Sequence, residues 1–274
     1  MRRRIELAAL LLVLLAAAAG WIFREQVRAA RWSLQGQLEL ASISPAAGPG
    51  AGPAPLHVAH AAGAYQGLRY TNALGALEHN YRRGVRWFEI DFASDARGKW
   101  WAVHDWQEIH RRLGIPLDRD GRGLPDAPDG LSPLMDVEGV LQWFGGHPDA
   151  RLVTDTKEDN RILIAQLALA PADLRPRIHP QIYRIREYPL ARAAGLGAPI
   201  FTTYRSRYPW PVLGRFARGH RLLALTATRE EADEACRALG GEVPLLIHTV
   251  NDPAEEARLL AAGIAGVYTD DLLP

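Results

Sequence analysis

The sequence predicts an α/β protein whose folded domain is a (β/α)8 TIM barrel with an excursion after the second strand, preceded by an N-terminal transmembrane helix. Eight short apolar runs rich in strand-forming residues follow residue 55, and the last five begin about every 22 residues, with helical patterns between them. Strands that alternate with helices form parallel sheets, and eight such units close into a barrel. An open doubly wound sheet is the alternative, but no Gly-x-Gly-x-x-Gly follows the first run.

The N-terminus carries an apolar stretch between charged residues. After "MRRR", residues 5–23 contain one acid, Glu6. A helix of that length just spans the hydrocarbon core of a bilayer. We therefore expect residues 1–23 to be a single-pass membrane anchor, with the folded domain exported to the periplasmic or extracellular side. The alternative is a signal peptide, because Ala17–Ala19 resembles a small-residue cleavage site, and the protein would then be secreted.

Residues 24–55 are expected to be a juxtamembrane segment and linker. Their last part, "SPAAGPGAGPAP", is too poor in large apolar residues to pack. We therefore expect the barrel to span residues 56–274. Its expected strands are residues 56–61, 85–92, 151–157, 177–183, 199–205, 221–227, 243–250 and 265–271.

Two local patterns refine this prediction. In "DPAEEARLLAAG", Asp252 can cap a helix, Pro253 suits the first turn and Gly263 suits the end. Residues 93–150 are too long for one strand–helix unit and contain turn-rich sequence, which predicts an excursion over one end of the barrel. Within it, Trp100 and Trp101 are compatible with a packed hairpin or with a lipid-contact surface.

Composition excludes several classes of protein. The formal net charge of +1 gives no field of one sign, so we expect no nucleic-acid partner. A single cysteine, Cys236, excludes a disulfide framework and a cysteine metal site. We expect a monomer. Six histidines are expected to be ordinary hydrogen-bonded structural residues: His57, His79, His110, His147, His179 and His220.

The run "FEIDF" places two carboxylates on one strand face. Side chains at i and i+2 point the same way, so Glu89 and Asp91 lie roughly 7 Å apart. Two like charges at that distance repel by about 2 kcal/mol at an effective dielectric of about 20. Asp155 ends the next strand of the barrel. Three acids converging at the barrel mouth predict a hard divalent cation, Mg²⁺ or Ca²⁺. A solvated strand face is the alternative interpretation of an isolated Glu-x-Asp pair.

Other polar residues fall at the same ends of the predicted strands, where barrel enzymes place their active sites. A hard cation, a lysine and two histidines suit attack on a phosphodiester, because one histidine takes a proton while the other gives one. The further candidates are His60, His104, Lys157, Gln181 and Arg205.

These motifs resemble the glycerophosphodiester phosphodiesterase family, in the superfamily that includes phosphatidylinositol-specific phospholipases C and sphingomyelinase D. The resemblance covers residues 56–272 and is carried by "HAAG", "TNALGALEHNYRRG", "FEIDF", "AVHD", "TDTK", "HTVNDP" and "GVYTD". It implies a small-molecule or lipid phosphodiester substrate, with His60 and His104 as the acid–base pair. It also implies Glu89, Asp91 and Asp155 as metal ligands, and Lys157 and Gln181 as phosphate or substrate contacts.

The sequence departs from the family pattern at four positions. The arginine expected after the first histidine is Ala61, and Arg205 is a candidate to replace its phosphate contact. Thr71 stands where glutamate is usual, and His248 where tryptophan is common. Asp155 replaces a glutamate, as in sphingomyelinase D. The substrate is therefore open among a glycerophosphodiester, a lipid of sphingomyelinase D type, and an anionic headgroup bound by a catalytically weak barrel.

Overall fold

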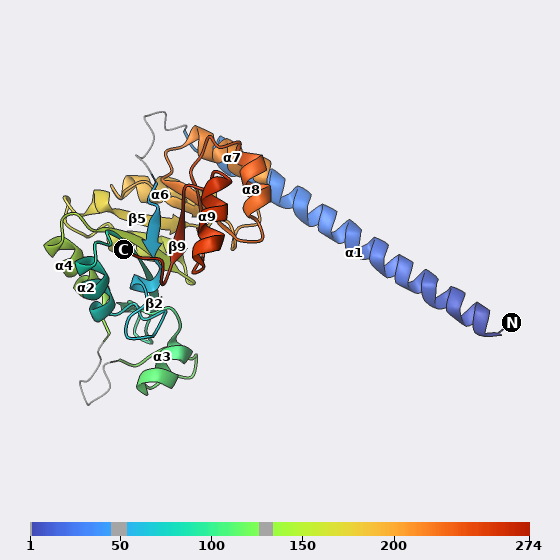
Figure 1. The fold of residues 1–274 in the computed structure, drawn as a ribbon. Coiled ribbons are helices and arrows are strands. Elements are labelled where there is room, and N and C mark those ends of the chain that lie inside the picture. Colours follow the sequence, from blue (N-terminus) through green and yellow to red (C-terminus); the bar gives the residue numbers. More distant parts are fainter. Residues whose placement is uncertain (1, 45–53, 126–133) are drawn as a thin grey trace.

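The protein folds into a closed barrel with a long helix projecting from one side (Figure 1). The structure is a computed structural model that describes residues 2–44, 54–125 and 134–274, with the side chains of 2–13, 15 and 16 outside the description. Pairing of β1 with both β2 and β9 closes the sheet, which confirms the predicted barrel. Its parallel strands within these residues are β1 (His57–Ala59), β2 (Trp87–Ser94), β4 (Arg151–Thr156), β5 (Ile178–Ile182), β6 (Ile200–Thr202), β7 (Ala224–Thr228), β8 (Leu245–His248) and β9 (Gly266–Thr269).

Helices surround the barrel and follow the strands in turn. In α9 the side chain of Asp252 accepts a hydrogen bond from the amide of Ala254, so the predicted cap is present. The α-helices of the barrel are α2 (Leu74–Arg82), α3 (Trp106–Leu113), α4 (Val137–Gly146), α5 (Asn160–Leu167), α6 (Tyr188–Ala193), α7 (Trp210–Gly219), α8 (Ala232–Leu239) and α9 (Pro253–Ala261). Short 3-10 turns occur at η1 (His60–Ala62), η2 (Arg175–Arg177) and η3 (Ile185–Glu187).

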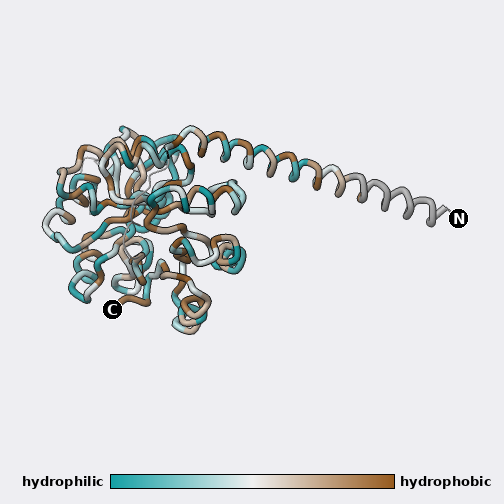
Figure 2. The backbone as a smooth tube through the Cα atoms, turned by 90° about the horizontal axis from the view of Figure 1, so that it is seen from above, coloured by the Kyte–Doolittle hydropathy of each residue, from teal (hydrophilic) through white to brown (hydrophobic). Residues whose placement is uncertain are grey.

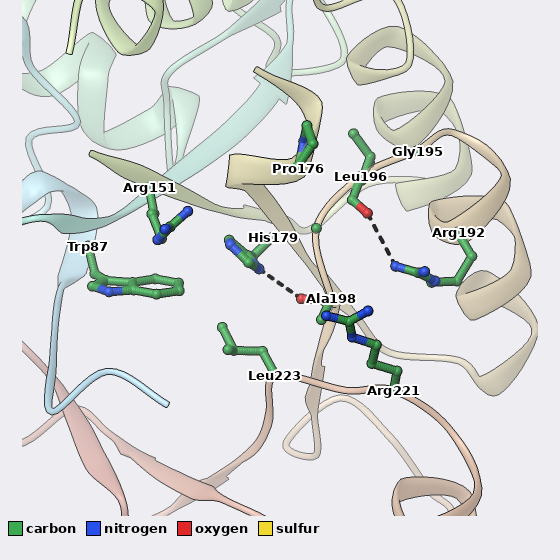
Figure 3. A pocket seen from close by; sticks show the side chains of 11 residues that line it. Trp87, Arg151, Pro176, His179, Arg192, Gly195, Leu196, Ala198, Arg221 and Leu223 are labelled. Atoms are coloured by element: carbon green, nitrogen blue, oxygen red, sulfur yellow. Dashed lines mark hydrogen bonds between the residues drawn. The ribbon is translucent and has the colours of Figure 1, made fainter. Parts of the chain in front are cut away.

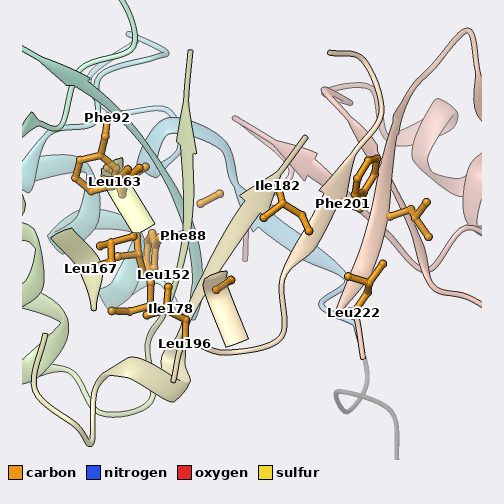
Figure 4. Packing of buried hydrophobic residues seen from close by; sticks show 14 of the residues in the cluster. Phe88, Phe92, Leu152, Leu163, Leu167, Ile178, Ile182, Leu196, Phe201 and Leu222 are labelled. Atoms are coloured by element: carbon orange, nitrogen blue, oxygen red, sulfur yellow. The ribbon is translucent and has the colours of Figure 1, made fainter. Parts of the chain in front are cut away.

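Alternation along the strands separates an outer core from the barrel interior. On β2, Phe88 and Phe92 join Leu152 and Ile178 in the layer between strands and helices, where Leu163 of α5 packs (Figure 4). The alternate positions of the same strands point inward. A smaller apolar cluster fills the middle of the barrel and includes Val58, Val153, Ala198, Ile200, Leu223, Ala224, Leu246 and Tyr268.

The excursion after β2 begins as a hairpin. Strand β3 (Trp100–Trp101) pairs antiparallel with the end of β2, and both tryptophans are buried. The indole nitrogen of Trp101 donates to Asp95 at 3.0 Å. Of the two interpretations of this tryptophan pair, the packed hairpin is therefore correct. Residues 126–133 of the excursion lie outside the described residues.

Helix α1 (Arg2–Ala41) is continuous, and its first part extends away from the barrel (Figures 1 and 2). Its last turns contact the barrel beside α7 and η3. The ring of Trp32 packs edge-on against Tyr208, with centroids 5.8 Å apart, and the Tyr208 hydroxyl donates to Glu39 at 2.6 Å. A stretch that we expected to be only a juxtamembrane segment thus includes residues that pack on the barrel.

In the part of the chain that the structure describes, no helix is both long enough and apolar enough to cross a membrane. The expected membrane-spanning segment, residues 5–23, includes many residues whose side chains lie outside the description. Most of the expected linker, residues 45–53, also lies outside it.

Candidate active site

Three buried carboxylates meet at the carboxyl ends of β2 and β4. Asp91 and Asp155 are register partners on adjacent strands, and Glu89 lies two residues earlier on the same inward face. Each is at most 3 % exposed. One oxygen from each residue lies within 4.8 Å of the others. The structure therefore brings together the three acids for which the sequence predicted a cation.

Each acid is held by a specific partner. The Asn72 side chain donates to Asp91 at 3.1 Å and accepts from the Asp91 amide at 3.0 Å. The Ala61 amide donates to Glu89 at 2.7 Å. These bonds fix the carboxylates before any ligand binds.

Asp155 has the strongest positive partner of the three acids. It accepts hydrogen bonds from the Lys157 ammonium and the Tyr183 hydroxyl, and the same ammonium lies 3.8 Å from Asp91. Burial acts to raise the pKa of Asp155, but Lys157 lowers it on balance. The pKa of Glu89, in contrast, is raised to about 8 by burial and then by the charge of Asp91.

This donor set fits a hard divalent cation. Three carboxylates facing one ammonium leave an excess of negative charge when all are ionised. Burial first, and then this repulsion between carboxylates, raises the pKa values of Glu89 and Asp91. The donors are all oxygens, which suit Mg²⁺ or Ca²⁺. Glu89, Asp91 and Asp155 can therefore hold one such ion.

His60 follows β1 and is oriented by a carboxylate. Its Nδ1 lies 3.0 Å from Asp270, which in turn accepts from the Asn251 side chain at 2.7 Å. Burial alone would lower the pKa of His60, but the hydrogen bond to Asp270 and the charges of Glu89 and Asp91 raise it to about 9. When no cation is bound, the His60 ring is therefore protonated at neutral pH, and Asp270 holds it in one orientation.

His104 reaches the same cavity from the excursion, and Tyr70 lies between the two histidines. The Tyr70 ring meets His60 and His104 edge-on, with centroids 4.6 and 5.4 Å apart. The cavity measures about 210 Å³. It is lined by His60, Tyr70, Glu89, His104, Asp155, Lys157, Gln181, Tyr204, His248, Thr249 and Tyr268.

The three predicted substrate contacts have different positions. Lys157 and Gln181 line the cavity, and the side-chain amide oxygen of Gln181 accepts a hydrogen bond from the Thr202 hydroxyl at 2.6 Å. Arg205 is not among the lining residues. Its guanidinium donates to the backbone carbonyls of Thr156 and Lys157 at 2.7 and 2.8 Å, so it supports the strand end that carries Lys157.

The sequence predicted no role for several residues of the site. Asn251 and Asp270 lie in the "HTVNDP" and "GVYTD" motifs, but nothing in their spacing shows that they orient His60. Asn72 likewise lies in a noted motif without a predicted role. Tyr70 and Tyr204 carry no signal, because a tyrosine in a loop usually indicates packing.

We expect the cation-free protein to lose stability as the pH rises. The pKa of Glu89 is about 8 in the folded protein against 4.5 normally, so its contribution is complete below about 4.5 and is lost as the pH rises through 8. His60 acts in the same direction, with about 9 against 6.5. Each group changes the free energy of unfolding by up to about 1.4 kcal/mol per pH unit. In EDTA, the midpoint temperature of thermal unfolding should fall as the pH is raised, and excess Mg²⁺ or Ca²⁺ should restore it. A midpoint that does not change with pH would contradict this expectation.

Replacing Asp270 by asparagine should lower kcat by about 10- to 100-fold without raising KM, because Asp270 orients His60 and does not line the cavity. Loss of the charge also lowers the pKa of His60, so the acidic limb of the pH–rate profile should move to lower pH. A fall in rate with an unmoved limb would mean that Asp270 is only structural. The pH dependence of kcat and of kcat/KM measures both effects.

No protein-family model matches this sequence. A search of curated proteins also finds no match. Sequence similarity alone therefore assigns no relative, and the informative comparison is with solved structures.

Several glycerophosphodiester phosphodiesterases have similar structures. The enzyme from Thermotoga maritima is 16% identical with a TM-score of 0.61, and the match covers 79% of this chain and 94% of that chain. One from Parabacteroides distasonis is 17% identical with a TM-score of 0.58, covering 80% and 94%. An Oleispira antarctica phosphodiesterase, solved with the product sn-glycerol-3-phosphate, is 17% identical with a TM-score of 0.57, covering 79% and 93%. This chain thus has the fold of the glycerophosphodiester phosphodiesterases, the family that its motifs resemble.

Proposed function

We propose that this protein is a metal-dependent phosphoric diester hydrolase that acts on a glycerophosphodiester or phospholipid-type substrate by His/His acid–base catalysis. One observation carries the proposal: two histidines from different parts of the chain line a cavity together with Glu89 and Asp155, two members of the cluster of three buried acids. The fold shared with glycerophosphodiester phosphodiesterases supports the same reaction class.

Glu89, Asp91 and Asp155 would hold one divalent cation, Mg²⁺ or Ca²⁺. When bound, the cation supplies a positive charge that orients phosphoryl oxygens and stabilises the charge that develops on them. Lys157 would contribute a second positive charge from the cavity wall, beside the Tyr204 hydroxyl at 3.2 Å. Gln181 would contact the substrate from the same wall.

His60 would act as the general base in its neutral form, because its Nδ1 hydrogen bond to Asp270 leaves the other ring nitrogen to accept a proton. A bound cation would favour that form, since it would offset the charges of Glu89 and Asp91 that raise the pKa of His60. The proton comes either from water or from a substrate hydroxyl next to the phosphate, and the second route forms a cyclic phosphate first. His104 would protonate the departing alcohol. It also lines a neighbouring cavity of about 300 Å³, which gives the leaving group room on the His104 side.

Arg205 serves this site indirectly. Its guanidinium binds the carbonyl of Lys157 and lies 4.9 Å from the Tyr183 ring centroid, while the Tyr183 hydroxyl donates to Asp155. We therefore propose Arg205 as a positioning residue for Lys157 and Asp155. This role replaces the direct phosphate contact that the missing arginine at Ala61 suggested.

A lipid phosphodiesterase of sphingomyelinase D type is the second candidate, favoured by an aspartate, Asp155, as the third acid. Turnover of glycerophosphocholine can be compared with turnover of intact lysophospholipid and sphingomyelin in detergent micelles. Faster cleavage of glycerophosphocholine supports the first candidate. Cleavage restricted to the intact lipids supports the second.

We further propose that the N-terminal segment attaches the protein to a membrane, with the catalytic domain exported, and the apolar run over residues 5–23 supports this. Trp21 and Phe23 are exposed on α1, as expected of residues that meet the headgroup region. Cell fractionation with a carbonate wash tests the proposal. Protein that stays with membranes supports an anchor, and release of a shortened chain supports signal cleavage.

Chelation should abolish diesterase activity of the full chain. We expect hydrolysis of bis(p-nitrophenyl) phosphate to fall by about 10³-fold in EDTA and to return with Mg²⁺ or Ca²⁺, because the charge on the phosphoryl oxygens then loses its main stabiliser. Full activity in EDTA would contradict the cation. Metal binding without turnover of this probe or of natural diesters would identify a barrel that only binds an anionic headgroup.

A further inference from the structure

A second cavity lies at the opposite end of the barrel from the acids (Figure 3). It measures about 600 Å³, within the range of small-ligand sites. Trp87 and Arg151, the first residues of β2 and β4, form one wall, and Arg192 and Arg221 form another. On β2, Trp87 precedes Asp91 by four residues, which corresponds to about 13 Å of strand.

An apolar layer separates this cavity from the candidate active site. Val58, Val153, Ile200 and Leu246 are fully buried in the middle of the barrel, and Tyr268 is 2 % exposed. A molecule in this second cavity therefore cannot contact the acid cluster. Any ligand that it takes is distinct from the diester substrate.

Three guanidinium groups face this cavity without a carboxylate to neutralise them. Among the described residues, no acid lines it, and Arg151, Arg192 and Arg221 form no ion pair. Arg192 has one long hydrogen bond, 3.5 Å to the Leu196 carbonyl. Elsewhere arginines such as Arg161 pair with a neighbouring carboxylate. The concentration of unneutralised positive charge in a concave site indicates an anionic ligand.

His179 adds a hydrogen-bond requirement. Its Nδ1 lies 3.0 Å from the Ala198 carbonyl, so this nitrogen carries the proton and Nε2 is an acceptor. Nε2 is buried and has no partner among the described residues, and Figure 3 shows the second ring nitrogen on the side of Arg151. Burial lowers the pKa of His179 to about 4, so the ring is neutral. A ligand that donates a hydroxyl proton would satisfy this atom.

The Trp87 ring of the cavity wall is already packed against two side chains. The Arg151 guanidinium lies 5.6 Å from the Trp87 ring centroid, and the His179 ring lies 4.9 Å from the same ring. The three arginines match the charge and the several oxygens of a phosphoryl group, which guanidinium groups bind in bidentate pairs.

We propose that this cavity binds a phosphate monoester that also carries a free hydroxyl. The phosphoryl oxygens lie among Arg151, Arg192 and Arg221, and the hydroxyl donates to Nε2 of His179. The site is independent of the proposed catalytic reaction, because its residues belong to the other end of the strands.

Calorimetric titration of the full chain in EDTA tests the proposal, with sn-glycerol 3-phosphate, methyl phosphate and inorganic phosphate as probes. We expect sn-glycerol 3-phosphate to bind, and Arg151→Gln/Arg221→Gln to weaken binding by about 100-fold, roughly tenfold for each lost charged pair. Arg161→Gln, which alters an exposed arginine elsewhere, should bind normally. Lys157→Met, which removes a cation from the catalytic cavity, should also bind normally.

The outcomes are distinct. No binding to the unaltered protein, or equal binding by the double variant, overturns the proposal. Binding that Lys157→Met abolishes and the double variant retains would locate the anion in the catalytic cavity. Methyl phosphate should bind about tenfold more weakly than sn-glycerol 3-phosphate, because it lacks the hydroxyl. Equal affinity for the two would refute the role of His179.

Discussion

Replacing Glu89 by glutamine should reduce cation-dependent diester hydrolysis by about 10³-fold and weaken cation binding. The substitution keeps the shape of the side chain and removes one of the three charges that face a shared point. The Ala61 amide that donates to Glu89 can still donate to the amide oxygen of glutamine. A local fold change is therefore not expected, and kcat/KM against cation concentration measures the effect.

The same variant should gain stability when no cation is present. At about pH 8 the cation-free protein holds a buried acid whose pKa is raised to about 8, and glutamine removes the cost of ionising it. Glu78→Gln is a suitable control, because Glu78 lies on α2 and pairs with Arg82. Opposite changes in activity and stability are expected of a ligand residue. Loss of both would indicate that Glu89 is only structural.

Replacing His104 by alanine should lower hydrolysis of natural diesters by about 10³-fold while largely sparing bis(p-nitrophenyl) phosphate. An alkoxide leaving group needs a proton in the transition state, and positioned general acids contribute about 10²- to 10⁴-fold. p-Nitrophenolate leaves without that proton. His60→Ala should slow hydrolysis of both substrates, because the proposed base activates the attacking nucleophile whichever leaving group departs.

The ratio of the two rates for each variant is the measurement. Equal losses on both substrates for His104→Ala would contradict its role as the acid. Retention of both activities in His60→Ala would contradict its role as the base. Circular dichroism and cation titration of each variant separate these outcomes from misfolding, since neither histidine belongs to the proposed ligand set.

The barrel and the acid cluster were predictable because both depend on short-range periodicity. Inward and outward residues alternate along β2, so Glu89 and Asp91 had to share a face, and parallel pairing placed Asp155 beside Asp91. The strand ends also indicated Lys157 and Gln181.

Contacts between distant segments were not predictable in this way. Asp270 meets His60 across 210 positions of sequence, and Tyr70 reaches both histidines from a loop. The prediction for Arg205 placed it at the correct strand end but could not show its direction, which the carbonyls of Thr156 and Lys157 determine. The arginines of the second cavity come from β4, from α6 and from the segment before β7, and no motif links them.

The docking of α1 bears on where a recombinant fragment of this protein should begin. A chain that starts in the linker keeps every strand but loses Trp32 and Glu39, which contact Tyr208. Gly36 lies so close to Val212 that an added methyl group would be 2.7 Å from its side chain, so the helix and barrel surfaces fit tightly there. A fragment that lacks the last turns of α1 would expose the barrel surface around Tyr208 and Val212, next to the loop of Tyr204 and Arg205. Fragments intended to represent the native protein should therefore start upstream of Trp32.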